Sequence, residues 1–475
     1  MSPTAWPSGD THPPYKHGTY PTMKTKLALL AAAAVVLAPM SALADEAALK
    51  AEIDLLKAQL AAQSARIERL EAAQVGGAGQ VATQAAPAPT AKPGEAIQTL
   101  AANAEPSKPA TAETETASAT TIGGYGEIAY SAYLKDRSRN QADLERFVLF
   151  FGHRFSDRIS FNSEFEIEHA VASASDKGEA EIEQAYLNYQ ISDAANIRAG
   201  LFLMPFGFIN RNHEPPVYYG AIRNEVETRI IPSTWREGGV SLYGSTKFGI
   251  DYDIGLTTGF DVAKLDDASK PLAATHQELQ FAHAADLSVY GSVDWKGVPG
   301  VDIGGGVFTG NTGQRNADFR QDSTQPNLAG IEARMTLWDL HARLQRSGFD
   351  LEAVYTRGTF EQAARLDSAI LAYNAANETD RPLVPGAFYG WYVQGAYTFN
   401  LKSDMAVSPF VRYERYDTQA SLPLGLTSDP ANRDKLVTLG FSFRPLSDIV
   451  VKADYQKFID HSQNDRINLG MGYMF

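Results

Sequence analysis

One segment of the chain, from about residue 205 to residue 235, carries charges of both signs in close succession. Its three arginines and three glutamates balance, and it contains no lysine, so it is formally neutral. Arginines and carboxylates that face each other across a narrow aqueous space create a transverse electric field, which orients dipolar molecules and filters ions. The residues that we predict to line such a space are Arg211, His213, Glu214, Arg223, Glu225, Glu227, Arg229 and Trp235.

Charged residues on the polar faces of other segments are candidates for the facing wall. The basic candidates are Arg158, Arg198, Arg412, Arg444 and Lys452. Carboxylates occupy comparable positions, as in the run Glu164, Glu166 and Glu168. For each charge of the 205–235 segment an alternative stays open, in which the charge pairs with a neighbour and only holds the segment in place.

Three aromatic residues of the same segment have two interpretations. Tyr218, Tyr219 and Trp235 would form a stacking surface for sugar rings if they lie along a path for solutes. Alternatively, these side chains anchor the segment against its surroundings.

The sequence contains no set of residues spaced for catalysis. Because cysteine is absent, disulfides, thiolate nucleophiles and thiolate metal sites are excluded. His153, His169 and His213 lack the spacing of a metal site. The glycine run Gly304–Gly306 lies within an alternating segment, so it does not indicate a phosphate-binding loop before a helix. We therefore predict no enzyme activity, no cofactor and no metal.

Charge and hydropathy exclude two further classes of protein. A formal net charge of −14 argues against a nucleic-acid partner, because no basic region is available to neutralise phosphates. A mean hydropathy below zero excludes a bundle of membrane-spanning helices. It leaves a membrane β-barrel open, because the strands of such a barrel are apolar on one face only.

From Thr121 onward, apolar and polar residues alternate with a period of two, which predicts β-strands. In the last segment Leu469 and Met471 point to one face, and Asn468 and Gly470 to the other. The alternation predicts sixteen strands, at about 121–134, 144–155, 157–170, 179–192, 195–204, 236–248, 249–261, 283–296, 300–310, 330–345, 348–360, 387–400, 405–417, 433–445, 447–460 and 465–475.

The connections between these strands alternate in length. Short turns such as Ser156-Asp157 and Pro445–Asp448 alternate with long segments such as 205–235 and 361–386. This layout is typical of an outer-membrane barrel, where lipid requires apolar outer faces and a closed sheet. We therefore predict an all-β transmembrane barrel of about sixteen antiparallel strands over 121–475. A soluble β-sandwich is the alternative, but it would not need strands this long.

The final residues also fit a barrel. Tyr473 and Phe475 continue the apolar face of the last predicted strand. A terminal aromatic residue in this pattern resembles the C-terminal signal by which the barrel-assembly machinery recognises outer-membrane proteins. We predict that Tyr473 and Phe475 carry that signal.

The N-terminal third has a different composition. Residues 1–44 are predicted to be a signal peptide, with 1–22 an over-long start, because Lys24 and Lys26 precede the apolar stretch Leu27–Ala38 and a small-residue cleavage site. The chain is therefore expected to be exported to the outer membrane of a Gram-negative cell.

Two further segments follow the signal peptide. Residues 45–73 repeat apolar residues with alternating spacings of four and three, which predicts a short α-helical coiled coil in the periplasm, most simply a trimer. A single amphipathic helix packed on the barrel is the alternative. Residues 74–120 are rich in Ala, Pro and Thr and predict a disordered linker.

The stretch Arg198–Gly207 ends in Pro-Phe-Gly and resembles the strand signature of the phosphate-selective porin O and P family. The stretches 212–216 and 230–238 are similar to the third-loop region of porins in that group. The resemblance implies a homotrimer of water-filled pores in outer-membrane lipid, each narrowed by an inward-folded third loop. Phosphate-selective members use arginine ladders and a lysine cluster near the constriction. The lysine-free, neutral segment 205–235 departs from that pattern.

Two hypotheses for function follow from this pattern. The first is an outer-membrane porin for passive diffusion of small hydrophilic solutes or ions, with the third loop (about 205–235) as constriction; the resemblance leaves phosphate or anion selectivity open. The second is a structural outer-membrane protein that tethers the envelope through its coiled coil, with the barrel plugged. An outer-membrane enzyme is a distant third.

Overall fold

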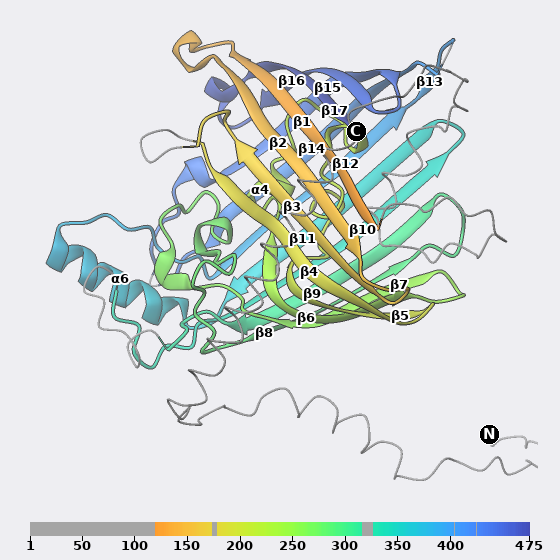
Figure 1. The fold of residues 1–475 in the computed structure, drawn as a ribbon. Helices are drawn as coiled ribbons and strands as arrows, with labels where there is room; N and C mark the ends of the chain where they lie inside the picture. Colours follow the sequence, from red (N-terminus) through yellow and green to blue (C-terminus); the bar gives the residue numbers. More distant parts are fainter. Residues whose placement is uncertain (1–118, 173–177, 316–325, 403, 424) are drawn as a thin grey trace, which may run out of the picture. The chain divides into compact units, whose positions relative to one another are not determined.

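The computed structural model describes residues 119–172, 178–315, 326–402, 404–423 and 425–475. The predicted signal peptide, coiled coil and nearly all of the predicted linker lie outside the described residues. The described part forms one closed antiparallel sheet (Figure 1). Its strands are β1 Thr120–Tyr133, β2 Gln141–Arg154, β3 Ile159–Glu168, β4 Ala180–Ser192, β5 Ala195–Leu203, β6 Arg236–Ser245, β7 Ile250–Thr257, β8 Ser288–Trp295, β9 Val301–Asn311, β10 Arg334–Arg346, β11 Phe349–Phe360, β12 Ala387–Tyr397, β13 Phe399–Asn400, β14 Ala406–Ser421, β15 Arg433–Leu446, β16 Ile449–Phe458 and β17 Arg466–Met474.

The sheet closes because the first and last strands pair. β1 runs antiparallel to β17, in a register from Tyr125↔Met474 to Tyr133↔Arg466. The two-residue β13 continues β12 beyond Thr398 and pairs with the same neighbour, β14. Counting β12 and β13 as one strand, the barrel has sixteen strands, which confirms the predicted number. Phe475 extends the seam, because its N–H donates to the Gly124 carbonyl at 2.9 Å.

The distribution of side chains is the reverse of that in a soluble protein. On β17, Leu469 is 50% exposed on the outer face, whereas Asn468 on the inner face is fully buried. β15 repeats the pattern, with Leu439 outside and Thr438 inside. Apolar side chains outside and polar side chains inside are what a barrel surrounded by lipid requires.

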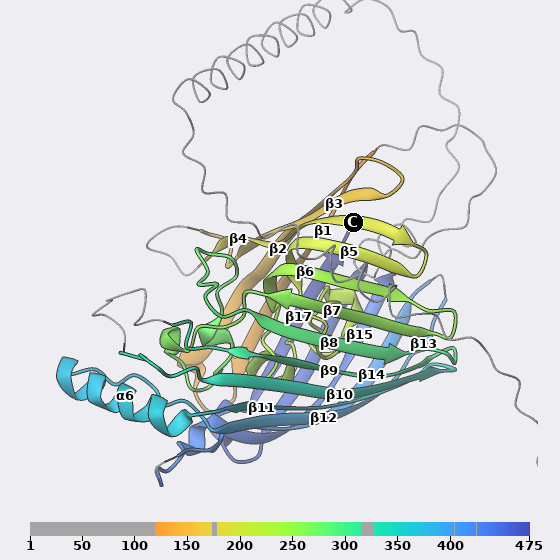
Figure 2. The same cartoon turned by 90° about the horizontal axis from the view of Figure 1, so that it is seen from below.

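The two ends of the barrel differ. One end has short turns such as Ser347-Gly348, and the other has longer connections that include α6 (Ala363–Asn377), as Figure 2 shows from below. The alternation predicts only a connection over 361–386, whereas α6 forms within this segment. Leu366 and Ile370, one helical turn apart, are buried against the barrel end. None of the described helices is long and apolar enough to cross a membrane.

An aromatic cluster fills the inside of the barrel near β5, β6 and β9. The Trp235 ring is fully buried, with ring centroids 5.0 Å from Phe206, 5.3 Å from Phe260 and 4.9 Å from Phe308. Trp235 immediately precedes β6, and Phe206 closely follows β5. The cluster therefore fixes both ends of the long segment between these strands.

A buried carboxylate makes the packing of α6 sensitive to pH. Asp367 is fully buried. One of its oxygens accepts from the Val384 N–H at 2.8 Å, and the other has no hydrogen-bond partner among the described residues. Burial raises the pKa of Asp367 from 3.8 to about 6. The folded state thus binds the proton more tightly than the unfolded state, so the α6 segment loses stability as pH rises from about 4 through 6.

Replacing Asp367 with asparagine is expected to remove this pH dependence, because the amide is neutral and keeps an oxygen for the Val384 N–H. At pH 7 the variant should be more stable locally by about 1 kcal/mol, the order of one uncompensated buried polar group. Hydrogen exchange of residues 363–377 at pH 4, 6 and 7.5 measures the effect. Asp380→Asn, which alters an exposed acid of the same connection, is the control. Equal pH profiles for wild type and Asp367→Asn would contradict the assignment.

Candidate functional site

Residues 204–235, between β5 and β6, are called here the inward loop. The loop includes the 3-10 turn η2 (Pro215–Val217) and the short helix α4 (Val226–Arg229). Its backbone reaches strands that are far apart around the barrel. The Gly207 N–H lies 3.4 Å from Asp339 Oδ2 on β10, and the Ala221 N–H donates to Asp454 on β16 at 2.6 Å. The inward loop therefore crosses the inside of the barrel.

The Pro-Phe-Gly sequence turns the chain inward. Gly207 has φ +64°, in the left-handed region that glycine adopts without strain. A Cβ at this position would also collide with the Glu227 carboxylate. The neighbouring Phe206 packs against Trp235, so the turn is held by the aromatic cluster on one side and a carboxylate on the other.

Glu227 is the main internal anchor of the inward loop. One carboxylate oxygen accepts from the N–H groups of Phe208 and Ile209, both at 2.8 Å. The other accepts from the Tyr392 hydroxyl on β12 at 2.7 Å. Burial raises the pKa of Glu227 above its ordinary value, while these hydrogen bonds oppose the shift. One side chain thus joins two parts of the loop to the wall.

Glu225 lies between two arginines. Its carboxylate oxygens are 2.6 Å from Arg229 Nε and 3.0 Å from Arg466 Nη2 on β17. Burial alone would raise the pKa of Glu225, but the charges of Arg229 and Arg466 hold it below its usual range. For the loop charges Glu225 and Arg229, the observed contacts therefore match the alternative in which a charge pairs with a neighbour and holds the loop in place.

The remaining charges of the loop have different surroundings. Arg211 is partly exposed and lies 3.6 Å from Asp294 on β8. Arg223 is buried and donates to the Ser233 hydroxyl. Glu214 is buried and lines a cavity on one side of the loop.

Three of the predicted wall residues face the inside of the barrel and are buried. Arg198 pairs with Asp253, and Arg412 pairs with Glu414 at 2.7 Å. Lys452 Nζ lies 3.4 Å from the centroid of the Tyr218 ring, a cation–π contact.

Arg412 also contacts the inward loop directly. Its Nη1 donates to the Tyr219 carbonyl at 3.3 Å. Arg444, a fourth wall candidate, is partly buried and lines the cavity. Arg158 does not belong to this set, because it lies exposed in the short turn before β3. Since β3 begins only at Ile159, the alternation of the strand does not orient Arg158, and its predicted place on the wall is wrong.

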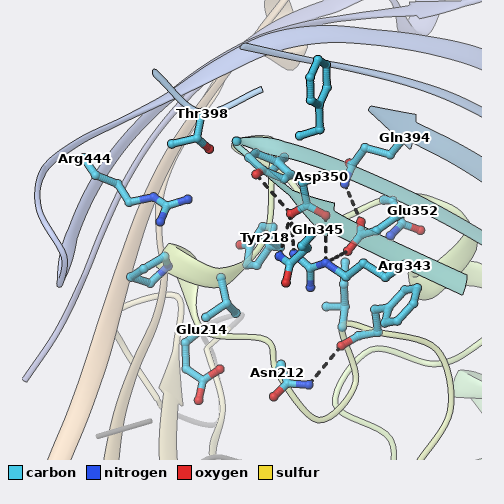
Figure 3. Close-up of a pocket in the computed structure, with 18 of the residues that line it drawn as sticks. Asn212, Glu214, Tyr218, Arg343, Gln345, Asp350, Glu352, Gln394, Thr398 and Arg444 are labelled. Carbon is cyan, nitrogen blue, oxygen red and sulfur yellow. Dashed lines mark hydrogen bonds and ion pairs between the residues drawn. The ribbon is translucent and has the colours of Figure 1, made fainter. Parts of the chain in front are cut away.

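A cavity of about 1050 Å³ lies between the inward loop and the short-turn end of the barrel (Figure 3). Its lining includes loop residues, wall residues and residues of the turns. Five basic residues line it (Lys296, Arg343, Arg346, Arg412 and Arg444), and so do five acidic ones (Glu214, Asp251, Asp350, Glu352 and Asp448). The lining is therefore formally balanced.

The β10–β11 hairpin supplies part of the lining that the sequence analysis missed. Arg343 Nη2 lies 2.6 Å from Asp350, and Arg343 Nε lies 3.3 Å from Glu352. Gln345 donates to Asp350 at 3.0 Å. These polar residues are spaced two apart on each strand, so the alternation of the sequence contains a signal for this part of the lining.

The aromatic residues of the loop divide into two groups. Tyr218 and Tyr219 line the cavity, and Tyr219 stacks on Phe410 with ring centroids 5.7 Å apart. Trp235 lies in the buried aromatic cluster instead. Its predicted place on a solute path is wrong, because no part of the side chain is accessible to solvent.

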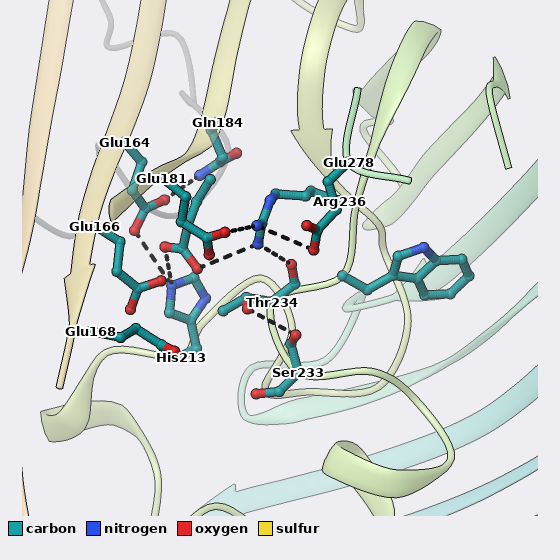
Figure 4. Close-up of polar contacts among 12 residues, drawn as sticks. Glu164, Glu166, Glu168, Glu181, Gln184, His213, Ser233, Thr234, Arg236 and Glu278 are labelled. Carbon is teal, nitrogen blue, oxygen red and sulfur yellow. Dashed lines mark hydrogen bonds and ion pairs between the residues drawn. The ribbon is translucent and has the colours of Figure 1, made fainter. Parts of the chain in front are cut away.

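On the opposite side of the loop, His213 meets a group of glutamates on β3 and β4 (Figure 4). His213 Nε2 lies 3.4 Å from Glu164 and 3.8 Å from Glu183. Burial and the charge of Arg223 lower the pKa of His213 to about 4. The spacing along the sequence indicated no metal ligands, but the fold brings together three side chains whose donor atoms lie within 4.8 Å of one another.

The chain is similar in sequence to known proteins. The profile of the family described as phosphate-selective porin O and P matches residues 111–218. An uncharacterized protein of Aquifex aeolicus (strain VF5) is 31% identical over 360 residues, covering 74% of this chain and 79% of that protein.

The fold is also similar to solved structures. A Salmonella typhi OmpF complex with daunomycin matches with a TM-score of 0.50 at 11% identity, covering 75% of this chain and 97% of that one. The outer-membrane channel DcaP of Acinetobacter baumannii matches with a TM-score of 0.45 at 13% identity, covering 75% and 97%. The anion-selective porin from Comamonas acidovorans matches with 0.43 at 12% identity, covering 75% and 99%.

Proposed function

The chain belongs to the phosphate-selective porin O and P family and is an outer-membrane channel, and from this premise we propose its mode of action. It is a water-filled channel for passive diffusion of small hydrophilic solutes or ions. The inward loop is its constriction, and its selectivity for charge is weak.

The balanced lining of the cavity carries this proposal. Five basic and five acidic residues surround the space beside the inward loop. Several of them neutralise each other at short range, as Arg343 and Asp350 do. A lumen with paired charges has a weak net potential, so it discriminates little between anions and cations. A phosphate filter would instead need unpaired basic side chains in excess.

The test is conduction by the purified protein in a planar bilayer. Stepwise openings, a small reversal potential across a KCl gradient and no block by inorganic phosphate are expected. Strong anion selectivity with phosphate block would overturn weak selectivity and assign the family's anion preference to this chain. A folded, heat-modifiable barrel that conducts no ions would overturn the channel mechanism.

Glu225 offers a direct test of the field inside the constriction. In Glu225→Gln, Arg229 and Arg466 lose their counter-charge, so anions should be favoured. One charge about 8 Å from an ion in water changes the ion's energy by about 0.5 kcal/mol, which corresponds to roughly a twofold change in permeability ratio. The reversal potential in a KCl gradient measures this change.

Glu361→Gln is the matched control, because Glu361 is exposed at the beginning of the long connection before β12. This control should leave the reversal potential unchanged. An identical reversal potential for Glu225→Gln and wild type would mean that the ion path does not pass near Glu225.

The assembly of the channel is part of the proposal. We expect export by the signal peptide 1–44, insertion through the signal at Tyr473 and Phe475, and a homotrimer in outer-membrane lipid. Heptads at 45–73 would add a trimeric coiled coil in the periplasm. Native mass spectrometry in detergent tests the trimer, and the same measurement after deletion of 45–120 shows whether the coiled coil is needed for it.

The second candidate function is a structural protein that tethers the envelope, and one observation favours it. The inward loop contacts the wall on several sides of the barrel, and most of its charged side chains are buried. A loop held in this way would also suit a plugged barrel. Deleting residues 45–120 separates the two functions: a channel keeps conducting, whereas a tether loses its attachment to the envelope.

A further inference from the structure

We propose that Glu164, Glu183 and His213 form a binding site for a divalent transition-metal cation, with Zn²⁺ as the representative ion. Two ligands come from the barrel wall, on β3 and β4, and the third comes from the inward loop. The proposed metal site does not depend on the proposed solute path. The proposal would therefore stand whether or not the barrel conducts ions.

The distances fit the coordination of such an ion. His213 Nε2 is 3.4 Å from Glu164 Oε1 and 3.8 Å from Glu183 Oε2. Zinc bonds to nitrogen and carboxylate oxygen are about 2.0–2.2 Å long, so ligand atoms in a tetrahedral shell are about 3.4 Å apart. The His213 Nε2 atom is thus within a few tenths of an ångström of this spacing from both carboxylates, and all three donor atoms lie within 4.8 Å of one another.

The imidazole is oriented as a metal ligand would be. His213 Nδ1 lies 3.1 Å from the Asn210 carbonyl oxygen, so this nitrogen carries the proton and donates it. Nε2 then presents its lone pair to the carboxylates of Glu164 and Glu183. Figure 4 shows the His213 ring beside Glu164. The Asn210 side chain is itself fixed by hydrogen bonds to the Met204 and Trp235 carbonyls. A carbonyl that holds the second ring nitrogen is the usual support of a metal-bound histidine.

Among the described residues, these donor atoms receive no hydrogen bond from an N–H or hydroxyl group. His213 is 2% exposed, and no hydrogen-bond donor or acceptor there reaches its Nε2. Glu183 is fully buried, neither of its oxygens accepts from an N–H or hydroxyl group of the described residues, and carboxylate oxygens of Glu164, Glu166 and Glu181 lie within 4.8 Å of it. Two buried carboxylates that face a lone pair repel one another, and a bound cation converts this repulsion into attraction.

The nearby arginines are directed at other carboxylates. Arg236 Nη2 lies 2.6 Å from Glu181 and 3.2 Å from Glu278, but its closest approach to Glu183 is 4.0 Å. On the other side of the group, Arg146 contacts Glu127, Glu166 and Glu168. Among the described residues, the ion pair of Glu183 with Arg236 is therefore a long one, which leaves room for a closer ligand.

A second His–carboxylate group in the barrel shows the contrast. His341 hydrogen-bonds through both ring nitrogens, at 2.6 Å to Asp339 and 2.7 Å to Asp294. That imidazole has no free lone pair for a metal, although Asp294, Asp302 and His341 also lie close together. His341 is therefore a matched control for His213, since both are buried and both face carboxylates.

The donor set indicates the class of ion. Imidazole nitrogen is suited to zinc and its first-row neighbours, whereas calcium and magnesium sites are built from oxygen alone. A bound ion would link the inward loop to β3 and β4.

The experiment is metal titration of the full-length protein in detergent after treatment with EDTA and dialysis. Isothermal titration with ZnCl₂ should give one site per chain, and Co²⁺ in its place should produce visible d–d absorption typical of a tetrahedral site. His213→Gln and Glu183→Gln should weaken binding by about 100-fold or more. His341→Gln should bind as the wild type does. Heat-modifiability on gels verifies that each variant has folded.

Three results would overturn the proposal. The first is a folded wild type with no stoichiometric binding of Zn²⁺ or Co²⁺, which would mean that protons alone neutralise the group. The second is unchanged binding by folded His213→Gln. The third is loss of binding in His341→Gln alone, which would place the metal at the other group. If neither His213→Gln nor Glu183→Gln folds, the wild-type titration and the Co²⁺ spectrum decide.

Discussion

Glu227→Ala will release the inward loop from the barrel wall and increase the single-channel conductance. The substitution removes the acceptor for the Phe208 and Ile209 N–H groups and for the Tyr392 hydroxyl. Leaving these buried donors without partners costs about 3 kcal/mol or more of loop docking energy. With that anchor lost, the loop should populate positions away from the wall, and the narrowest part of the channel should widen.

Single-channel recording in KCl measures this effect, with limited proteolysis of the loop as a second readout. Tyr392→Phe removes one of the four hydrogen bonds that Glu227 accepts and should have an intermediate effect. Glu352→Gln removes a carboxylate from the cavity without touching the loop anchors, so it separates loss of charge from loss of docking. If Glu227→Ala and Glu352→Gln give the same conductance, Glu227 does not hold the constriction.

Trp235→Ala is expected to destabilise the barrel by about 3–5 kcal/mol, the cost of deleting a large buried aromatic side chain. The indole packs against three phenylalanine rings and is fully buried. Its Nε1–H also donates to Glu237 at 3.1 Å, so the substitution removes a donor from a buried carboxylate.

The temperature at which the folded band disappears on unheated and heated gels measures this loss of stability. Trp295→Ala is the control, because Trp295 lies on the outer face of β8 and is 40% exposed. Trp295→Ala should destabilise the barrel much less than Trp235→Ala. A similar midpoint for the two variants would mean that the aromatic cluster contributes little to the stability of the barrel.

Much of the barrel could be predicted from the sequence, because lipid outside and polar side chains inside impose a period of two on every strand. Leu469 and Asn468 are consecutive in the chain and have opposite environments, as the alternation predicted. Helix α6 is not predicted by the alternation, because its buried apolar residues, Leu366 and Ile370, repeat at helical and not at strand spacing. Their separation of four residues in an alanine-rich stretch was the signal that could have revealed it.

The site was less predictable, because its contacts join residues that are distant in the chain. The sequence places the charges of the inward loop correctly between β5 and β6, but not their partners. His213 meets Glu164 and Glu183 only because the loop crosses the barrel, and no spacing along the chain encodes that meeting. The prediction for Arg158 is wrong for a local reason. The alternating pattern was continued back to Arg158, which lies one residue before the start of β3.

The position of the inward loop has a consequence for the order of folding. The loop contacts both sides of the β1–β17 seam from within: the Tyr218 hydroxyl donates to Glu127 on β1, and Glu225 pairs with Arg466 on β17. Across the seam itself, Ser131 bonds to Asn468, 337 residues away in the chain. Such non-local pairing is slow, because a long chain must be ordered before the contact forms.

A docked inward loop shortens that search, because it presents contacts for β17 beside those already made to β1. Closure of the barrel and docking of the loop then become one cooperative late step. The inward loop is thus an internal template for the seam. Substitutions that free the loop should slow barrel closure even where the completed barrel remains stable.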